Sequence, residues 1–186
     1  MVSGDVGAGD KPSGTTAVAV FAGGCFWCME HPFDALPSVI STISGYMGGH
    51  IENPTYKEVS NGKTGHSEAL QVTYDPAKVS YEKLLEVFWR NIDPFDDDGQ
   101  FCDKGDQYRA AIFYQDDTQK QLAEASKTEI AKKFPNRHVA TTIKAARKFF
   151  PAEDYHQGYY LSNPAAYEFY RFTCGRDHRL SQIWDE

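Results

Sequence analysis

The sequence predicts an α+β fold in which helices pack on a mixed β-sheet. Short apolar runs rich in β-branched residues alternate with segments whose apolar residues recur at helical spacing. These segments follow the order β-α-β-β-α-β-α-β, which favours a ferredoxin-like two-layer sandwich with a long C-terminal segment. No internal repeat or low-complexity tract interrupts the 186 residues. We therefore expect a single domain over residues 17–186 with an extended C-terminal tail, after a disordered leader at 1–16.

The first half of the chain supplies three strands and two helices. The strands are the apolar runs at 16–21, 39–46 and 68–74. The first helix begins at Cys25, and Pro37 ends it because proline interrupts helical hydrogen bonding. Ser80 is a suitable N-cap for an amphipathic helix over 81–92. A loop rich in glycine and proline fills 47–66, and loops of this length inside compact domains are often functional.

The second half continues the alternation after a polar loop at 93–107. We expect a strand at 108–114, a charged surface helix at 117–134 and a further strand at 139–143. An aromatic segment after Pro151 has short-helical character, and a polar tail begins at Gly175. These elements complete the predicted sheet and one helical layer.

Composition excludes several classes of function. The chain carries 19 Lys and Arg against 26 Asp and Glu, a net charge of −7, and it has no basic tract. We therefore expect no binding to nucleic acid or to anionic lipid. Its apolar runs are far shorter than the roughly 20 residues of a membrane span. The small, polar first 16 residues do not have the pattern of a signal peptide, so we expect a cytoplasmic protein.

Four cysteines, Cys25, Cys28, Cys102 and Cys174, are too few for a disulfide scaffold in a chain of this length. A structural zinc site needs a second CxxC motif or a Cys/His pair at ligand spacing, and Cys102 and Cys174 stand alone. We therefore predict no metal site. Cysteines in a reducing compartment are either inert or redox-active, and their surroundings must decide between the two.

The strongest local signal is the segment GGCFWC, which places Cys25 where a strand turns into a helix. Free backbone N–H groups and the helix dipole at that position favour a thiolate, so we expect a lowered pKa for Cys25. Gly24 lets the backbone turn sharply and leaves room for a substrate, and Phe26 and Trp27 offer an aromatic wall. Two alternatives remain: a buried structural cysteine, and a thioredoxin-like CxxC site formed with Cys28.

A series of motifs then runs through the chain in a specific order. The segments are GCFWCME, GYMGG, NPTY, GHSEA, QVTYDP, LLEVFW, QFCDKGDQYRAAIF and FFPAEDYHQGYY, followed by Asn163-Pro164. Together they resemble the A-type peptide methionine sulfoxide reductases, from about residue 18 to residue 174. The resemblance implies an enzyme that reduces methionine sulfoxide, free or in oxidised proteins, and it implies roles for individual residues.

By this resemblance, Cys25 is the nucleophile that attacks the sulfoxide sulfur. Glu68 is the acid that protonates the sulfoxide oxygen, and burial would keep it protonated. Tyr56 and Tyr108 correspond to the family's hydroxyl donors, and Asp103 corresponds to its hydrogen-bonding aspartate. This set supplies a nucleophile, an acid and donors aimed at the oxygen, as the chemistry requires.

The resemblance also implies a binding pocket for the substrate's S-methyl group. Phe26 and Trp27 would hold the methyl group, and Gly24 lies beside them. Such a pocket prefers the S epimer, because only one arrangement places methyl on the aromatic rings and oxygen on the donors. We expect His156 to orient these groups, with a structural histidine as the alternative.

Attack leaves methionine and a sulfenic acid on Cys25, which a second thiol must convert to an intramolecular disulfide. Thioredoxin then reduces that disulfide, so no metal or organic cofactor is implied. We rank Cys174 first as the resolving thiol, because many relatives place it in a C-terminal segment, then Cys28 and then Cys102. We expect a monomer that repairs oxidised proteins.

Two other functions compete with this interpretation. A thiol–disulfide oxidoreductase using Cys25 and Cys28 would reduce disulfides and would be indifferent to Glu68. A non-catalytic module that binds sulfoxides or peptides would lack the nucleophile or the acid, and both are present.

Overall fold

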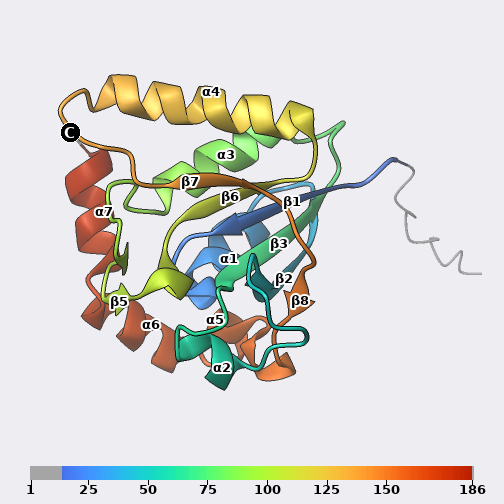
Figure 1. The fold of residues 1–186 in the computed structure, drawn as a ribbon, viewed down its shortest axis with the longest axis vertical. Coiled ribbons are helices and arrows are strands. Elements are labelled where there is room, and N and C mark those ends of the chain that lie inside the picture. Colours follow the sequence, from blue (N-terminus) through green and yellow to red (C-terminus); the bar gives the residue numbers. More distant parts are fainter. Residues whose placement is uncertain (1–13, 186) are drawn as a thin grey trace, which may run out of the picture.

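The computed structural model describes residues 14–185, and within them a six-stranded sheet carries the fold (Figure 1). The strand order is β7-β6-β1-β3-β2-β8, and a separate hairpin joins β4 to β5. The strands are β1 (Ala17–Ala22), β2 (Val39–Met47), β3 (Ser67–Tyr74), β4 (Gly99–Gln100), β5 (Asp103–Lys104), β6 (Ala111–Tyr114), β7 (Thr142–Ala145) and β8 (Phe150–Pro151). β6 and β7 are parallel, whereas the other paired strands are antiparallel. The predicted α+β class with a mixed sheet is therefore confirmed.

Seven α-helices accompany these strands within residues 14–185. They are α1 (Phe26–Asp34), α2 (Tyr56–Ser60), α3 (Tyr81–Arg90), α4 (Asp117–Lys133), α5 (Tyr159–Ser162), α6 (Pro164–Thr173) and α7 (Arg176–Trp184). Figure 1 shows α4 running along β6 and β7, with α2, α5 and α6 gathered at the opposite end of the molecule. None of the described helices is long and apolar enough to cross a bilayer.

Alternation along the strands separates the core into two faces. Phe21 and its same-face neighbours point toward α1, α3 and α4, where Phe21 stacks on Phe33 at 5.2 Å and on Phe88 at 5.1 Å. Val20 and Phe113 point to the other face with a smaller apolar cluster. Because side chains alternate across a strand, each face buries every second residue. Truncating a core phenylalanine such as Phe21 would cost about 3–5 kcal/mol.

Several element boundaries differ from the predicted ones. The expected strand at 108–114 begins at Ala111, because Asp106–Tyr108 forms a 3-10 turn. The expected strand at 139–143 lies at Thr142–Ala145, and the loop at 47–66 contains α2. The expected leader at 1–16 lies almost wholly outside the described residues.

The expected polar tail after Gly175 is instead the helix α7. Gly175 takes a left-handed conformation with φ of +70°, which ends α6 and lets the chain start a new helix. Ile183 and Trp184 of α7 are buried against the main core, and Trp184 meets Phe134 edge to face. Apolar contacts at one face of this mostly polar segment therefore decide its structure.

The sheet register brings the ends of three strands together. β1 and β3 run antiparallel with Phe21 opposite Leu70, so the turn that follows β1 lies beside the start of β3. On the other side of β3, Tyr46 of β2 lies opposite Glu68. The N-terminus of α1 therefore contacts Glu68 near the first residues of the central strand β3.

Candidate active site

Cys25 sits at the turn between β1 and α1, as the sequence predicts. Gly24, which precedes it, has φ of +82°, and a Cβ there would lie 2.6 Å from the Cβ of Gln100. Only glycine fits this position, because an L side chain would be strained in that conformation and would clash. Cys25 is the N-cap residue of α1 and is 7% exposed. The tight turn thus presents a nearly buried sulfur at the start of a helix.

A pocket of about 60 Å³ opens beside Cys25 and gathers residues from distant parts of the chain. Its lining consists of Cys25, Phe26, Trp27, Tyr56, Glu68, Asp103, Tyr108 and Tyr170. Seven of these eight residues are ones that the sequence singled out. Tyr170 is the exception.

Glu68 lies in the central part of the sheet, where water is excluded. It is 2% exposed, and its Oε2 accepts a hydrogen bond of 3.1 Å from the backbone N–H of Phe26. Burial raises the pKa of Glu68 to about 8; nearby Asp103 adds to the rise, whereas the Phe26 N–H opposes it. The carboxyl group is therefore mostly protonated at neutral pH and can give a proton to a ligand.

The expectation that the helix start lowers the pKa of Cys25 is wrong. Burial raises the pKa of this thiol well above its ordinary value, and Cys28 and Glu68 add to the rise. The N–H of Phe26, the first residue of α1, is already bonded to Glu68 rather than directed at a thiolate. Desolvation thus outweighs the helix dipole, and Cys25 rests as a neutral thiol.

Cys28 lies three residues after Cys25, and its pKa is shifted in the opposite direction. Its pKa is lowered to about 6 by a side-chain hydrogen bond with Cys25 and by the positive charges of Arg176 and Arg171, with burial opposing. Arg176 is itself 2% exposed, and its Nη2 donates to the carbonyls of Gly23 at 3.1 Å and Asn91 at 2.7 Å. A buried cation therefore supports a thiolate at Cys28.

Two tyrosines supply hydroxyl groups to the pocket. Tyr56 begins α2, where Thr55 and Glu58 form a capping box and where the Tyr56 N–H donates to Glu153 Oε2 at 3.1 Å. Burial raises the pKa of Tyr56 to about 12, and burial together with Glu68 raises the pKa of Tyr108. Both hydroxyls stay protonated at neutral pH and can donate hydrogen bonds.

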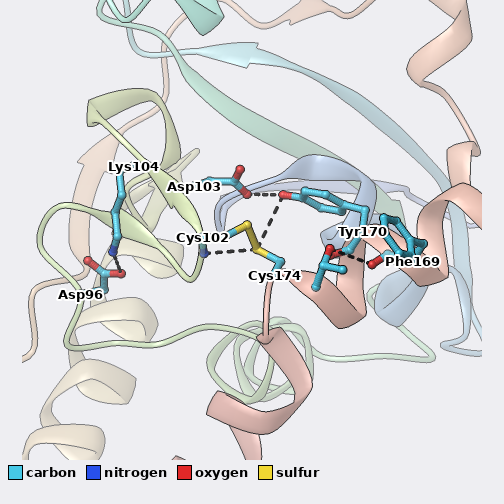
Figure 2. Close-up of a disulfide and its surroundings, with 8 residues drawn as sticks. Asp96, Cys102, Asp103, Lys104, Phe169, Tyr170 and Cys174 are labelled. Carbon is cyan, nitrogen blue, oxygen red and sulfur yellow. Dashed lines mark hydrogen bonds and ion pairs between the residues drawn. A yellow bond between two sulfur atoms is a disulfide. The ribbon is translucent and has the colours of Figure 1, made fainter.

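Asp103 and Tyr170 face the pocket as a hydrogen-bonded pair. The Tyr170 hydroxyl donates to Asp103 Oδ2, as Figure 2 shows. Burial raises the pKa of Asp103, although this hydrogen bond opposes the rise. The sequence analysis missed Tyr170, and the available signal was its spacing of four residues from Cys174, which places both on one face of α6.

Trp27 is held in place by two aromatic neighbours. Its Nε1 donates to Nδ1 of His156 at 2.9 Å, and its ring stacks on Tyr159 with centroids 3.8 Å apart. His156 is fully buried, and burial lowers its pKa, so the ring is neutral and accepts the bond. His156 also packs against Phe26 and Tyr56. It thus contacts the aromatic wall without lining the pocket.

This fold and site coincide with a known group of enzymes. The family model for peptide methionine sulfoxide reductase matches residues 17–186. The chain belongs to that family. It is 53% identical over 171 residues to the peptide methionine sulfoxide reductase MsrA of Bacillus subtilis, covering 90% of this chain and 95% of the relative. As a family member, it is an enzyme that reduces methionine sulfoxide.

Solved structures agree with this assignment. The reduced form of Mxr1 from Saccharomyces cerevisiae matches with a TM-score of 0.76 and 34% identity, covering 83% of this chain and 89% of that one. The same yeast protein in complex with Trx2 matches with a TM-score of 0.55 and 26% identity, covering 82% and 89%. This chain therefore shares its fold with these Mxr1 structures.

In this reductase the other two cysteines form a disulfide, Cys102–Cys174 (Figure 2). The bond joins the β4–β5 hairpin to the corner between α6 and α7, whereas Cys25 and Cys28 are free thiols. Cys102 is exposed and Cys174 is half-buried. Cys174, ranked first as the partner of Cys25, is thus bonded to Cys102, and its resolving role stays a prediction.

Potential metal ligands gather at the same place in the reductase. The one such group of three within residues 14–185 is Cys102, Asp103 and Cys174. Cysteine binds metals as a thiolate, and both sulfurs here are held in the disulfide, so the group does not fit a metal in this state.

A larger apolar groove of about 490 Å³ lies elsewhere, between α3 and α4. Its lining includes Leu85, Trp89 and Trp184 and shares no residue with the Cys25 pocket. Its lining contains no cysteine, whereas the smaller pocket is lined by Cys25 and Glu68.

Proposed function

We propose that this reductase acts on the S epimer of methionine sulfoxide, free or in oxidised proteins, through a sulfenic acid on Cys25. The observation that carries the proposal is the pocket itself. Cys25, the protonated Glu68 and the two tyrosines Tyr56 and Tyr108 all line the same space. These are the groups that oxygen transfer from a sulfoxide needs.

The reaction moves one oxygen atom from substrate to enzyme. The carboxyl of Glu68 and the two tyrosine hydroxyls donate hydrogen bonds to the sulfoxide oxygen, which makes the substrate sulfur more electrophilic. The Cys25 sulfur attacks that sulfur as the thiol loses its proton and the oxygen gains one. The products are methionine and a Cys25 sulfenic acid, so thiol plus sulfoxide becomes sulfenic acid plus thioether.

The preference for the S epimer follows from the two sides of the pocket. Phe26 and Trp27 form an apolar side that suits a methyl group, whereas Glu68 and the tyrosines form a side of hydrogen-bond donors. In the R epimer the methyl group would face the donors and leave them unpaired. Leaving buried donors unpaired costs about 1–3 kcal/mol each, which is enough for strong discrimination.

Recycling needs only thiols. The sulfenic acid condenses with a second thiol of the chain, releases water and forms an intramolecular disulfide, which thioredoxin reduces. The complex of Mxr1 with Trx2 supports thioredoxin as the reductant. Because cysteines supply both electrons, no metal or organic cofactor takes part. We further propose a monomeric, single-domain enzyme that repairs oxidised proteins in the cytoplasm, where thiols are kept reduced.

The test uses separated S and R epimers of N-acetyl-methionine sulfoxide with dithiothreitol as the reductant. We expect turnover of the S epimer alone. Equal turnover of both epimers would overturn the assignment of the two pocket sides. No turnover of either would overturn the function, and reduction of insulin disulfides would then decide whether the Cys25–Cys28 pair serves as a thiol–disulfide oxidoreductase.

A further inference from the structure

We propose that Glu30 is a positioning residue that fixes Trp27 in the wall of the Cys25 pocket by holding residues 156–159 against α1. This role rests on the reductase function proposed above and deepens it, because it assigns part of the substrate affinity to a residue outside the pocket. Glu30 does not line the pocket, yet it lies on α1 three residues after Trp27. Residues three apart on a helix are neighbours on its surface, so both can contact the same segment.

The carboxyl group of Glu30 is enclosed by hydrogen-bond donors. Glu30 is 3% exposed, and the backbone N–H of Gly158 donates to both of its carboxyl oxygens, each at 3.0 Å. The Thr42 hydroxyl approaches Oε1 at 3.5 Å. None of the ion pairs within residues 14–185 includes Glu30. Because a buried carboxyl group is costly unless it is hydrogen-bonded, the contact with Gly158 is the main interaction that suits an acidic residue here.

Gly158 is the point at which the segment turns into α5. It has a left-handed φ of +58° and offers no side chain to cap that helix. The preceding residue, Gln157, is bonded to the backbone of Ser44 in β2, with Oε1 accepting and Nε2 donating at 2.8 Å each. The segment is thus anchored to β2 before the turn and to Glu30 at the turn. The placement of Tyr159, which follows the turn, therefore depends on Glu30.

Trp27 contacts this segment at two residues. Its Nε1 donates to Nδ1 of His156 at 2.9 Å, and its ring lies nearly parallel to that of Tyr159, at 7° and with centroids 3.8 Å apart. A stacked pair at this distance restricts the plane of the indole. Trp27 lines the Cys25 pocket, whereas His156 and Tyr159 do not. Glu30 therefore acts on the pocket wall through Tyr159.

The wall supplies binding and not the groups that react. Phe26 and Trp27 form the apolar side that suits the substrate's methyl group, apart from the thiol of Cys25 and the acid Glu68. A displaced Trp27 would lose apolar contact with the methyl group in the bound substrate and in the transition state alike. Losing such uniform binding weakens affinity and leaves the maximum rate unchanged.

Two substitutions of similar length separate the hydrogen bond of Glu30 from its charge. Burial raises the pKa of Glu30 to about 7, and the Gly158 N–H opposes the rise. The charged and neutral forms both keep an oxygen that accepts from this N–H. Glu30→Gln also keeps such an oxygen, whereas Glu30→Met fills a similar volume without one. The pair therefore differs in the acceptor that the positioning role requires.

A control at Gln119 reports the effect of losing buried hydrogen bonds elsewhere. Gln119 is 6% exposed on α4 and does not line the pocket. Its amide accepts from the N–H of Gln115 at 3.0 Å and donates to the carbonyl of Val18 at 2.9 Å. Gln119→Met removes both bonds, as Glu30→Met removes its own. It therefore lowers stability without touching Trp27.

The test measures single-turnover rates of reduced enzyme against the concentration of the S epimer of N-acetyl-methionine sulfoxide. In Glu30→Met we expect the half-saturating concentration to rise about three- to tenfold, because the methyl group loses apolar contact. We expect its maximum rate to stay within about twofold of the natural enzyme. Glu30→Gln and Gln119→Met should match the natural enzyme in both quantities.

Tyr159→Ala tests the route and leaves Glu30 in place, so it remains informative if Glu30→Met does not fold. It should raise the half-saturating concentration by a similar factor. Combining it with Glu30→Met should add little, because both changes release the same ring.

A spectroscopic measurement follows Trp27 without substrate. The three tryptophans are replaced by 5-fluorotryptophan, and Trp27→Phe assigns one of the fluorine resonances. In Glu30→Met we expect the Trp27 resonance to shift while those of Trp89 and Trp184 stay in place. Glu30→Gln should leave all three unchanged.

The results that contradict the positioning role are distinct from failure of the function. An unchanged half-saturating concentration in Glu30→Met, or in Tyr159→Ala, would overturn the role. So would an equal rise in Gln119→Met, which would indicate general loss of stability, or a fall in maximum rate alone, which would place the effect on the chemistry. No product from the natural enzyme would instead overturn the proposed function, and the fluorine shift of Trp27 would then decide whether Glu30 positions the wall.

Discussion

The two cysteine pairs of this reductase differ in almost every physical respect. Cys25 and Cys28 are buried at the start of a helix, beside a protonated carboxyl and a buried guanidinium. Cys102 and Cys174 link an exposed hairpin to a corner between two helices. The comparison teaches that one fold can give its cysteines opposite environments, because burial removes one pair from water while a surface hairpin leaves Cys102 of the other pair accessible to a partner.

The largest expected effect distinguishes the nucleophile from every other thiol. Cys25→Ser should lower reduction of the S epimer by at least about 10³-fold, because a hydroxyl is a far weaker nucleophile toward sulfur. The measurement is turnover of N-acetyl-methionine sulfoxide with dithiothreitol. Residual turnover near that of the natural enzyme would remove Cys25 from its role.

Cys174 should be required for recycling by thioredoxin and not for the first reduction of sulfoxide. With thioredoxin as the only reductant, Cys174→Ser should make about one methionine per enzyme and then stop, because the thiol ranked first for converting the Cys25 sulfenic acid to a disulfide is missing. A time course with catalytic enzyme measures this, and adding dithiothreitol, a small reductant, tests whether a missing thiol is the obstacle. Sustained cycling with thioredoxin alone would show that recycling does not need Cys174.

Glu68 should make the rate of the first turnover depend on pH. Glu68→Gln should lower the rate of the first turnover by about 10²–10⁴-fold, because glutamine cannot give a proton. In the natural enzyme Glu68, with a pKa of about 8, is protonated below that pH. Its contribution is thus present at neutral pH and is lost as the pH rises through 8. Single-turnover rates of reduced enzyme across this range test it, and the same alkaline decline in Glu68→Gln would contradict it.

The buried cation should matter for both stability and reactivity. Arg176→Gln removes donors from the carbonyls of Gly23 and Asn91 and should cost about 2–3 kcal/mol of unfolding free energy in denaturant titrations. It should also raise the pKa of Cys28, read from the pH dependence of alkylation at that residue. Arg176→Lys keeps the charge and serves as the matched control. An unchanged Cys28 profile in Arg176→Gln would mean that the cation does not support the thiolate.

The smallest effect on activity is expected from Tyr170, which lies between the Cys25 pocket and the Cys102–Cys174 disulfide. Tyr170→Phe removes one hydrogen bond to Asp103 but keeps the ring against Trp27. A loss of about 1 kcal/mol corresponds to a fall of roughly fivefold in kcat/KM for the S epimer. Tyr167→Phe on the same helix provides the comparison, since Tyr167 does not line the pocket. Equal effects of the two changes would indicate a general disturbance of α6.

Sequence patterns predicted much of the architecture because they are local. The apolar runs that became β1 and β3 and the amphipathic helix after Ser80 lie within one or two residues of their expected places. The tail after Gly175 was misread because few of its residues are apolar, and only their contacts with the core show that it is a helix. Tyr170 was missed because its one local signal, the spacing of four residues from Cys174, does not separate a pocket tyrosine from a packing one.

The sequence by itself determined the strands β1 and β3, the helix after Ser80, the glycine turn that presents Cys25, and the motifs that name the family. Only the tertiary structure decided that the Cys25 thiol is neutral, that Cys28 carries the lowered pKa, and that Cys102 and Cys174 are bonded across 72 positions. The reason is physical. A pKa depends on burial and on charges brought from distant segments, and a disulfide depends on the distance between two sulfurs. Neither quantity is encoded in neighbouring residues.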